Sequence, residues 1–318
     1  MKQPQPMPQA LPKFEVLPRD LSAYKAGNVG VDYVHRFDSG LPGPHVLINA
    51  LTHGNEFCGM TAATHLLDSG VRPRIGTLTV SFANVQAYET FDQDKPFDSR
   101  QIEHNLNRIW SSTWLDGPEQ SPELKRAREM RGVVAAADHI LDIHSTSQPV
   151  QPFWVYPQFE RNGRVALAIG RPGVHLVMPQ GLVSGTPLIQ HGLHGSGEHH
   201  GVAVVVECGQ HFARSSSALA IEVALDFIAH FGLIERTAAP RCQPTPQRFE
   251  LLQTWVVKSA EFRFTRPLIG FETFAQGELI ATDGAEEIRA LCDDCTVLMP
   301  TRAPIVGREG VYLARPMV

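Results

Sequence analysis

The chain has no long hydrophobic run and no strong excess of charge of either sign. None of its 318 residues belongs to a stretch that approaches the roughly 18–20 uninterrupted apolar residues of a membrane-spanning helix. The formal net charge is only −5, so the basic surface stripe typical of nucleic-acid-binding proteins is not expected. These absences argue against a membrane partner and against a nucleic-acid partner.

Cysteine is also scarce, with five residues at irregular spacings. An odd, irregular set argues against the disulfide framework of a small secreted domain. Cys292 and Cys295 form one isolated CxxC pair, whereas a zinc ribbon needs two such pairs. The N-terminus has Pro and Gln where a signal peptide needs a continuous apolar segment. We therefore expect a soluble protein of a reducing, cytoplasmic compartment.

What the chain does contain is enough apolar material for a large core, at 43% hydrophobic residues. Short apolar runs alternate with helical patterns, which is typical of an α/β sheet covered by helices on both faces. Strands are predicted at residues 45–50, 77–82, 139–143, 153–156, 174–178 and 202–206, and helices at 57–67, 122–137 and 215–231. Residues 84–121 form a long polar connection, of a kind that is often functional.

The pattern changes after about residue 240. Residues 241–248 carry two Pro and no apolar periodicity, and short strands with Gly-containing turns follow them. We therefore predict a flexible lead-in over residues 1–18, an α/β domain over 19–240 and a small β-rich domain over 241–318.

Candidate metal ligands follow two of the predicted strands. His53 and Glu56 are three residues apart across a turn at Gly54, so both can reach one ion. His144 ends another apolar strand, and Asp142 on the same strand face could orient its imidazole. Two His and one carboxylate, with a fourth position for water, are a common catalytic zinc set. An isolated HxxE pair also arises by chance; the second strand-end His favours the metal site.

Four motifs occur in a fixed order along the chain: HGNE at 53–56, NLNR at 105–108, DIHS at 142–145 and VECG at 206–209. Together they resemble the succinylglutamate desuccinylase/aspartoacylase family, which is related in fold to the zinc carboxypeptidases. The resemblance spans roughly residues 40–230, and it is weaker in the C-terminal part. It implies a mixed, mostly parallel sheet with helices on both faces, followed by a small β-rich domain.

The resemblance also implies site residues. One Zn²⁺ per chain would be held by His53, Glu56 and His144, and Glu207 would be the catalytic carboxylate. A carboxylate there can take a proton from water and pass it to the leaving amine. Without the other motifs, Glu207 would be interpreted as a surface or ion-paired residue at the end of a strand.

Four further residues are implied as substrate contacts or catalytic groups. Arg108 would hold a substrate carboxylate through two parallel hydrogen bonds, and Asn107 would add an amide donor. Arg100 would stabilise the oxyanion. Tyr312 would close over the substrate, as a tyrosine does in some relatives. The alternative for each arginine is a solvated loop residue.

One departure from the family pattern concerns specificity. Aspartoacylases carry a further arginine shortly before the catalytic glutamate, whereas residues 194–200 read HGSGEHH. The histidines at 191, 194, 199 and 200 belong either to a polar Gly-rich loop or to an active-site lid that replaces this arginine.

The sequence therefore predicts a zinc-dependent amidohydrolase that deacylates a small N-acyl amino acid. A metallocarboxypeptidase acting on short peptides is one alternative, and a metal- or ligand-binding relative without catalysis is another. The acyl group and the amino acid are left open, and so is a homo-oligomer.

Overall fold

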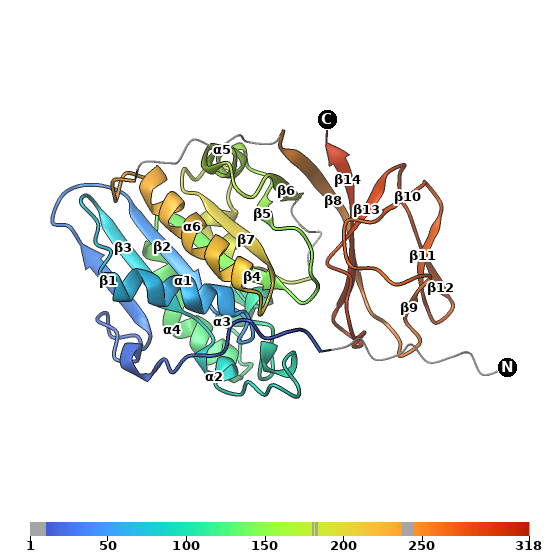
Figure 1. The fold of residues 1–318 in the computed structure, drawn as a ribbon, viewed down its shortest axis with the longest axis horizontal. Coiled ribbons are helices and arrows are strands. Elements are labelled where there is room, and N and C mark those ends of the chain that lie inside the picture. Colours follow the sequence, from blue (N-terminus) through green and yellow to red (C-terminus); the bar gives the residue numbers. More distant parts are fainter. Residues whose placement is uncertain (1–10, 180, 182–183, 237–244, 318) are drawn as a thin grey trace.

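The computed structural model describes residues 11–179, 181, 184–236 and 245–317, and its main feature is an eleven-stranded mixed sheet (Figure 1). The strand order is β1-β3-β2-β4-β7-β5-β6-β8-β14-β13-β10, and a second, three-stranded sheet has the order β12-β11-β9. The strands are β1 (Val34–Asp38), β2 (His45–Ala50), β3 (Thr77–Phe82), β4 (His139–Thr146), β5 (Phe153–Pro157), β6 (Val174–Met178), β7 (Ala203–Gln210), β8 (Gln247–Val256), β9 (Arg263–Phe264), β10 (Thr273–Phe274), β11 (Leu279–Asp283), β12 (Glu286–Arg289), β13 (Cys295–Leu298) and β14 (Glu309–Met317).

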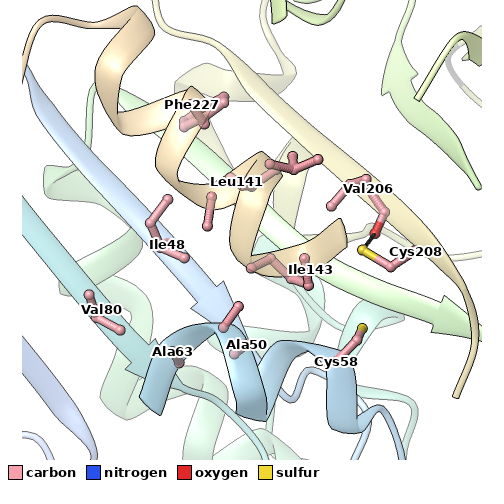
Figure 2. Close-up of a cluster of buried hydrophobic side chains, with 14 of the residues drawn as sticks. Ile48, Ala50, Cys58, Ala63, Val80, Leu141, Ile143, Val206, Cys208 and Phe227 are labelled. Carbon is pink, nitrogen blue, oxygen red and sulfur yellow. Dashed lines mark hydrogen bonds between the residues drawn. The ribbon is translucent and has the colours of Figure 1, made fainter. Parts of the chain in front are cut away.

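The helices lie on both faces of the large sheet, as the alternating pattern predicts (Figure 1). Their bounds are α1 (Phe57–Asp68), α2 (Val85–Tyr88), α3 (Ser112–Leu115), α4 (Pro122–Ala136), α5 (Glu160–Ile169) and α6 (Arg214–His230), with 3₁₀ turns η1 (Ser22–Tyr24), η2 (Asp98–Arg100), η3 (Leu106–Arg108), η4 (Leu188–Gln190) and η5 (Gly192–Gly195). Helices α1, α5 and α6 bury one face of the sheet and α4 buries the other. Figure 2 shows side chains of β2, β4 and β7 packed beneath α1 and α6.

Strands β2, β4 and β7 are parallel neighbours at the centre of the sheet. Their inner residues are buried on both faces, which explains why they read as continuous apolar runs in the sequence. The pairing sets His144 of β4 opposite Glu207 of β7. Because parallel strands end at the same edge, the polar residues at their carboxyl ends lie together.

Most of the predicted elements of the α/β part are present, several with the predicted bounds, whereas β1, α5 and the short helices α2 and α3 were missed. Strand β1 is an edge strand with one buried residue of five, so it lacks an apolar signature. Helix α5 contains Gly163, which weakens a helical pattern. That Gly faces the ring of Tyr156, and an added Cβ would lie 3.5 Å from the Tyr156 hydroxyl.

The C-terminal part continues the large sheet. Strand β8 pairs in parallel with β6 and antiparallel with β14, so the same sheet runs from the α/β part into the β-rich part. A separate apolar cluster fills the space between the two sheets there. The predicted domain boundary at residue 240 lies outside the described residues.

The predicted lead-in is described only from residue 11, and residues 1–10 lie outside the described part of the chain. The backbone N–H groups of Glu15 and Val16 both donate to the carbonyl of Phe212. Among the described helices, none is long and apolar enough to cross a membrane. The cysteines within the described residues are free thiols: Cys58, Cys208, Cys292 and Cys295.

Candidate metal centre and active site

The turn after β2 is strained and tightly packed. Leu51 is fully buried and has a φ of 57°, a left-handed conformation that a bulky residue rarely adopts. Gly54 then passes so close to other segments that an added Cβ would lie 2.4 Å from the Ser99 carbonyl oxygen and from the Tyr88 nitrogen. This turn directs both His53 and Glu56 inward at the carboxyl end of the sheet. Strain of this kind is often retained at functional sites.

The three predicted metal ligands come together. His53, Glu56 and His144 are at most 3% exposed, and they offer ligand atoms that all lie within 4.8 Å of one another. The Nδ1 atom of His53 lies 2.8 Å from Glu56 Oε1, and Nδ1 of His144 lies 2.9 Å from Glu56 Oε2. One carboxylate therefore faces one nitrogen of each imidazole.

The outer nitrogen of each imidazole has a fixed partner. His53 Nε2 lies 2.9 Å from Asn105 Oδ1, and His144 Nε2 lies 2.8 Å from Asp142 Oδ2. Asp142 is held in turn through its other oxygen, which accepts hydrogen bonds of 2.8 Å from the side chains of Asn49 and Thr52. The predicted role of Asp142, to orient the imidazole of His144, agrees with this contact.

The donor chemistry of this cluster fits a metal ion. Asn105 Oδ1 also accepts the backbone N–H of Asn107, so it is an acceptor and His53 Nε2 must donate to it. A neutral ring that donates through Nε2 presents a lone pair at Nδ1. Glu56 Oε2 is buried, and Nδ1 of His144 faces it at 2.9 Å. The lone pairs of His53 Nδ1 and of the Glu56 carboxylate thus face one point beside Nδ1 of His144, and a metal ion that replaces the His144 proton would bind all three groups.

The electrostatics of the cluster favour positive charge at this point. Burial raises the pKa of Glu56, but the two imidazoles outweigh burial and hold the pKa well below its usual value. Burial and Arg100 lower the pKa of His53 to about 4. Burial also lowers the pKa of His144, but Asp142 and Glu56 outweigh it and hold the pKa well above its usual value. The ionised Glu56 therefore attracts positive charge, either a proton on His144 or a metal ion in its place.

Glu207 borders this cluster. It stands opposite His144 in the β4–β7 pairing and is 8% exposed. Its Oε2 atom is buried and receives no hydrogen bond from the described residues. Burial raises the pKa of Glu207 to about 8, against the opposing effect of His144. The carboxyl group is thus poised to exchange a proton near neutral pH.

Arg100 and Asn107 flank the cluster from the long polar connection. Arg100, at the end of η2, places its guanidinium 3.5 Å from Glu56 Oε1 and remains about one-third exposed, at 32%. Its backbone carbonyl accepts the N–H of Gly54. Asn107 is buried, and its Oδ1 accepts the N–H of Leu188 at 3.0 Å, which leaves the NH₂ end of the amide for other contacts.

Arg108 has partners that the sequence did not predict. Its Nε donates to Glu309 Oε1 at 2.6 Å, one terminal nitrogen donates to the Tyr312 hydroxyl at 2.9 Å, and the other donates to the Asn107 carbonyl at 2.7 Å. Ser184 donates to the same Glu309 oxygen at 2.6 Å. Tyr312 of β14 therefore reaches the predicted substrate-binding arginine, and a carboxylate of the chain already pairs with it.

The lid alternative for the histidine loop is wrong for His194 and His199. His194 Nε2 lies 3.3 Å from the carbonyl oxygen of Asp138, which precedes the first residue of β4, and His199 packs against the His194 ring. The predicted metal ligand His144 lies near the opposite end of that strand, six residues further on. At about 3.3 Å per residue, the two ends are roughly 20 Å apart. His191 lies nearby in the chain and contacts the Trp110 carbonyl instead.

Two residues of this site were missed by sequence reasoning. Asn105 begins the NLNR motif, so its position was available, but its contact with His53 across 52 residues was not. Glu309 stands three residues before Tyr312 on β14, and both contact Arg108. This spacing alone did not indicate a shared partner, because the path of the strand was needed to see it.

Part of the chain is similar in sequence to known proteins. The family model for the succinylglutamate desuccinylase/aspartoacylase catalytic domain matches residues 42–178. Two curated relatives, the N-acyl-aromatic-L-amino acid amidohydrolases (carboxylate-forming) of Rattus norvegicus and Mus musculus, are each 32% identical, over 114 and 126 residues. These matches cover 32% and 34% of this chain, and only 33% and 37% of the relatives' own length.

Solved structures share the whole fold. The succinylglutamate desuccinylase of Vibrio cholerae aligns with a TM-score of 0.69 and 20% identity, over 90% of this chain and 86% of that one. The ectoine utilization protein EutE of Ruegeria pomeroyi aligns with a TM-score of 0.61 and 16% identity, over 90% and 88%. The chain thus matches the succinylglutamate desuccinylase/aspartoacylase catalytic domain over residues 42–178, and it shares its fold with solved structures of that kind.

Proposed function

We propose that the protein is a zinc-dependent hydrolase that removes the acyl group from a small N-acyl amino acid. The observation that carries the proposal is the buried convergence of His53, Glu56 and His144 beside Glu207. A metal-binding protein without catalysis would have no need of a second carboxyl group at the edge of the cluster, one whose Oε2 atom receives no hydrogen bond from the described residues.

The residues have separate roles in this proposal. His53, Glu56 and His144 would hold the zinc, which when bound lowers the pKa of water and polarises a carbonyl group. Glu207 takes a proton from the attacking water and delivers it to the leaving amine nitrogen. Its lack of another hydrogen-bond partner leaves one carboxyl oxygen for this transfer.

Arg100 is proposed to stabilise the negative oxygen of the tetrahedral intermediate. Its guanidinium lies beside Glu56 and keeps access to solvent, so a substrate can reach it. A preorganised cationic donor at such a position is typically worth a few kcal/mol of barrier lowering.

Arg108 is proposed to bind the carboxylate of the substrate. A guanidinium has five N–H groups, and the contacts with Glu309, Tyr312 and the Asn107 carbonyl use three of them. Two N–H groups therefore remain for a planar carboxylate. Glu309 fixes the orientation of the guanidinium, and Asn107 offers an amide NH₂ beside it.

A small substrate is favoured over a peptide because the C-terminal part reaches the site. Glu309 and Tyr312 of β14 contact Arg108, so a second segment of the chain borders the space beside it. This arrangement limits the room for residues beyond a single acyl group, and it favours deacylation over carboxypeptidase activity.

The proposal is tested with purified protein and a panel of N-acetyl, N-succinyl and N-formyl amino acids. Because the rat relative is named for N-acyl aromatic amino acids, the panel includes these. We expect hydrolysis that a chelator abolishes and that added zinc restores. Hydrolysis of short peptides but of no acyl amino acid would favour the carboxypeptidase alternative.

The isosteric variant Glu207→Gln isolates the proton transfer. It should retain zinc and lower kcat by about 100-fold to 10,000-fold, because general acid–base groups contribute on that order. Hydrolysis within a few-fold of the unmodified protein would remove Glu207 from the mechanism, while loss of zinc would reassign it as a ligand.

A further inference from the structure

Several residues of the site lie in a connection with little regular structure. Residues 100–108, between β3 and α4, supply Arg100, Asn105, Asn107 and Arg108, and contain only the 3₁₀ turns η2 and η3. Loops of this kind are mobile unless their backbone polar groups are bound elsewhere. The hydrogen bonds of the residues between Arg100 and Asn105 therefore decide whether the site residues of this loop keep fixed positions.

These hydrogen bonds converge on Glu123, a fully buried residue in the first turn of α4. The backbone N–H groups of Ile102, Glu103 and His104 donate to its carboxylate at 2.6, 3.2 and 3.1 Å. The side-chain amide of Asn84 adds a fourth bond at 3.3 Å. Each carboxylate oxygen receives two donors, since Oε1 accepts from Ile102 and Asn84 and Oε2 from Glu103 and His104.

The bound segment connects directly to the metal ligands. Asn105 follows the third donor, and its Oδ1 is 2.9 Å from His53 Nε2. At the other end of the segment, the Arg100 carbonyl accepts the N–H of Gly54. Glu123 is thus the central anchor of a loop whose two ends contact the turn that carries His53 and Glu56.

A carboxylate suits this anchor better than a neutral group. Three backbone N–H groups and the amino end of α4 all present partial positive charge to it. No salt bridge to Glu123 exists among the described residues, so the backbone itself compensates the buried charge.

We propose that Glu123 is a positioning residue of the active site. By gathering the backbone N–H groups of residues 102–104, it sets Asn105 against His53 and Arg100 against Glu56. The expected changes in zinc affinity rest on the proposed function. The anchoring of residues 102–104 by Glu123 does not.

The substitution Glu123→Gln keeps the size of the side chain but removes its negative charge and one of its two acceptor oxygens. Whichever way the amide is turned, its NH₂ faces two N–H donors, so one of the two donor pairs loses its acceptor. We expect faster amide hydrogen exchange either at Ile102 or at Glu103 and His104, depending on which pair faces the NH₂ group. We also expect zinc affinity to fall by about 10-fold to 100-fold, the usual effect of losing a group that orients a metal ligand.

Three further variants make the test specific. Ser121→Ala removes the cap that accepts the Leu124 N–H at the same helix end, so it should lower thermal stability but leave zinc affinity unchanged. Asn105→Ala should lower zinc affinity directly. Glu123→Asp keeps both acceptor oxygens one methylene shorter and should recover part of the affinity lost in Glu123→Gln.

The decisive measurement is zinc competition against a chromophoric chelator for the unmodified protein, Glu123→Gln, Asn105→Ala and the double variant. If Glu123 acts through Asn105, the double variant binds zinc about as weakly as the weaker single variant, not with the product of both losses. The proposal would be overturned if Glu123→Gln bound zinc as tightly as the unmodified protein while Asn105→Ala lost affinity. It would also be overturned if the loss in the double variant equalled the product of the two single losses. An unmodified protein that binds no zinc would overturn the proposed function, while unchanged amide exchange at residues 102–104 would overturn the anchoring alone.

Discussion

The proposed metal-binding half of the site (the metal half) and the proposed substrate-binding half (the substrate half) are assembled differently. The ligands of the metal half follow two adjacent parallel strands, β2 and β4, and Glu207 lies on the next strand, β7. In the substrate half, Arg108 lies in a loop, and its partners Glu309 and Tyr312 come from β14, 201 and 204 residues further along the chain.

The difference has a physical consequence. The metal half depends on the register of a fully buried sheet, which a change elsewhere in the chain hardly alters. The substrate half depends on the docking of β14 through β8 onto the same sheet, and on one ion pair between Arg108 and Glu309. Substitutions in the first half should therefore act on the metal and on catalysis, and those in the second on substrate binding and stability.

The largest effect is expected from His144→Ala, which removes one of three proposed ligands and leaves the Oδ2 atom of buried Asp142 without the imidazole. Zinc should be lost and hydrolysis should fall below detection. Metal analysis of the folded variant checks this, with His175→Ala as the control, since His175 is equally buried but contacts Tyr156 and not the cluster. Full zinc in folded His144→Ala would remove this residue from the ligand set.

Glu309→Gln should reduce stability in a pH-dependent way. Burial raises the pKa of Glu309, but Arg108 and the Ser184 hydroxyl outweigh it and lower the pKa to about 2. Because an unfolded glutamate titrates near pH ~4.3, the ionised carboxylate stabilises the fold fully above that pH. This contribution, roughly 2–3 kcal/mol, is lost as the pH falls from there toward 2.

Urea unfolding of the unmodified protein and Glu309→Gln, at steps from pH 7 to pH 3, measures this contribution. The difference in unfolding free energy should be largest at pH 7 and shrink below about pH 4. A difference that stays constant over this range would mean that the charge of Glu309 is not what stabilises the pair.

Arg108→Lys tests the carboxylate contact of the substrate half. Lysine keeps the charge but offers a point charge in place of a planar fork, so turnover of an N-acyl amino acid should fall about tenfold to a hundredfold. A substrate analogue with its carboxylate converted to an amide should bind poorly to the unmodified protein and lose little more in the variant. Equal losses for the acid and the amide would show that Arg108 does not hold the carboxylate.

The smallest effect is expected from Tyr312→Phe. This change removes one hydrogen bond to Arg108, a loss of about 0.5–1.5 kcal/mol, and keeps the buried ring. KM should rise a few-fold while kcat stays nearly constant, because zinc and Glu207 are untouched. A large fall in kcat with KM unchanged would instead give the Tyr312 hydroxyl a part in the chemical step.

The same contrast explains what the sequence could predict. The strand at residues 45–50 and the turn to His53 and Glu56 are local, and the buried strands leave apolar runs that mark their ends. The pairing of His144 with these residues follows from parallel strands ending at one edge. The fold class and the meeting of the three ligands were therefore predictable from residues alone.

The partners of Arg108 were not predictable in that way. Glu309 contacts Arg108 only because β14 pairs with β8 and β8 with β6, and nothing in the composition of residues 309–312 indicates that pairing. Helix α5 was missed because of Gly163, and the lid alternative failed for His194 and His199 because these two residues pack at the amino end of β4. Long-range packing decided the partners of Arg108 and the place of His194 and His199, whereas α5 was hidden by a local feature of its sequence.

The central claim is that His53, Glu56 and His144 hold one catalytic zinc ion. Anomalous diffraction from crystals of the purified protein, recorded on both sides of the zinc absorption edge, tests it most directly. The account predicts one peak per chain, bounded by Nδ1 of His53, Nδ1 of His144 and the Glu56 carboxylate, at about 2.0–2.2 Å from each. No peak there in zinc-supplemented crystals, or a peak at another set of residues, would contradict it.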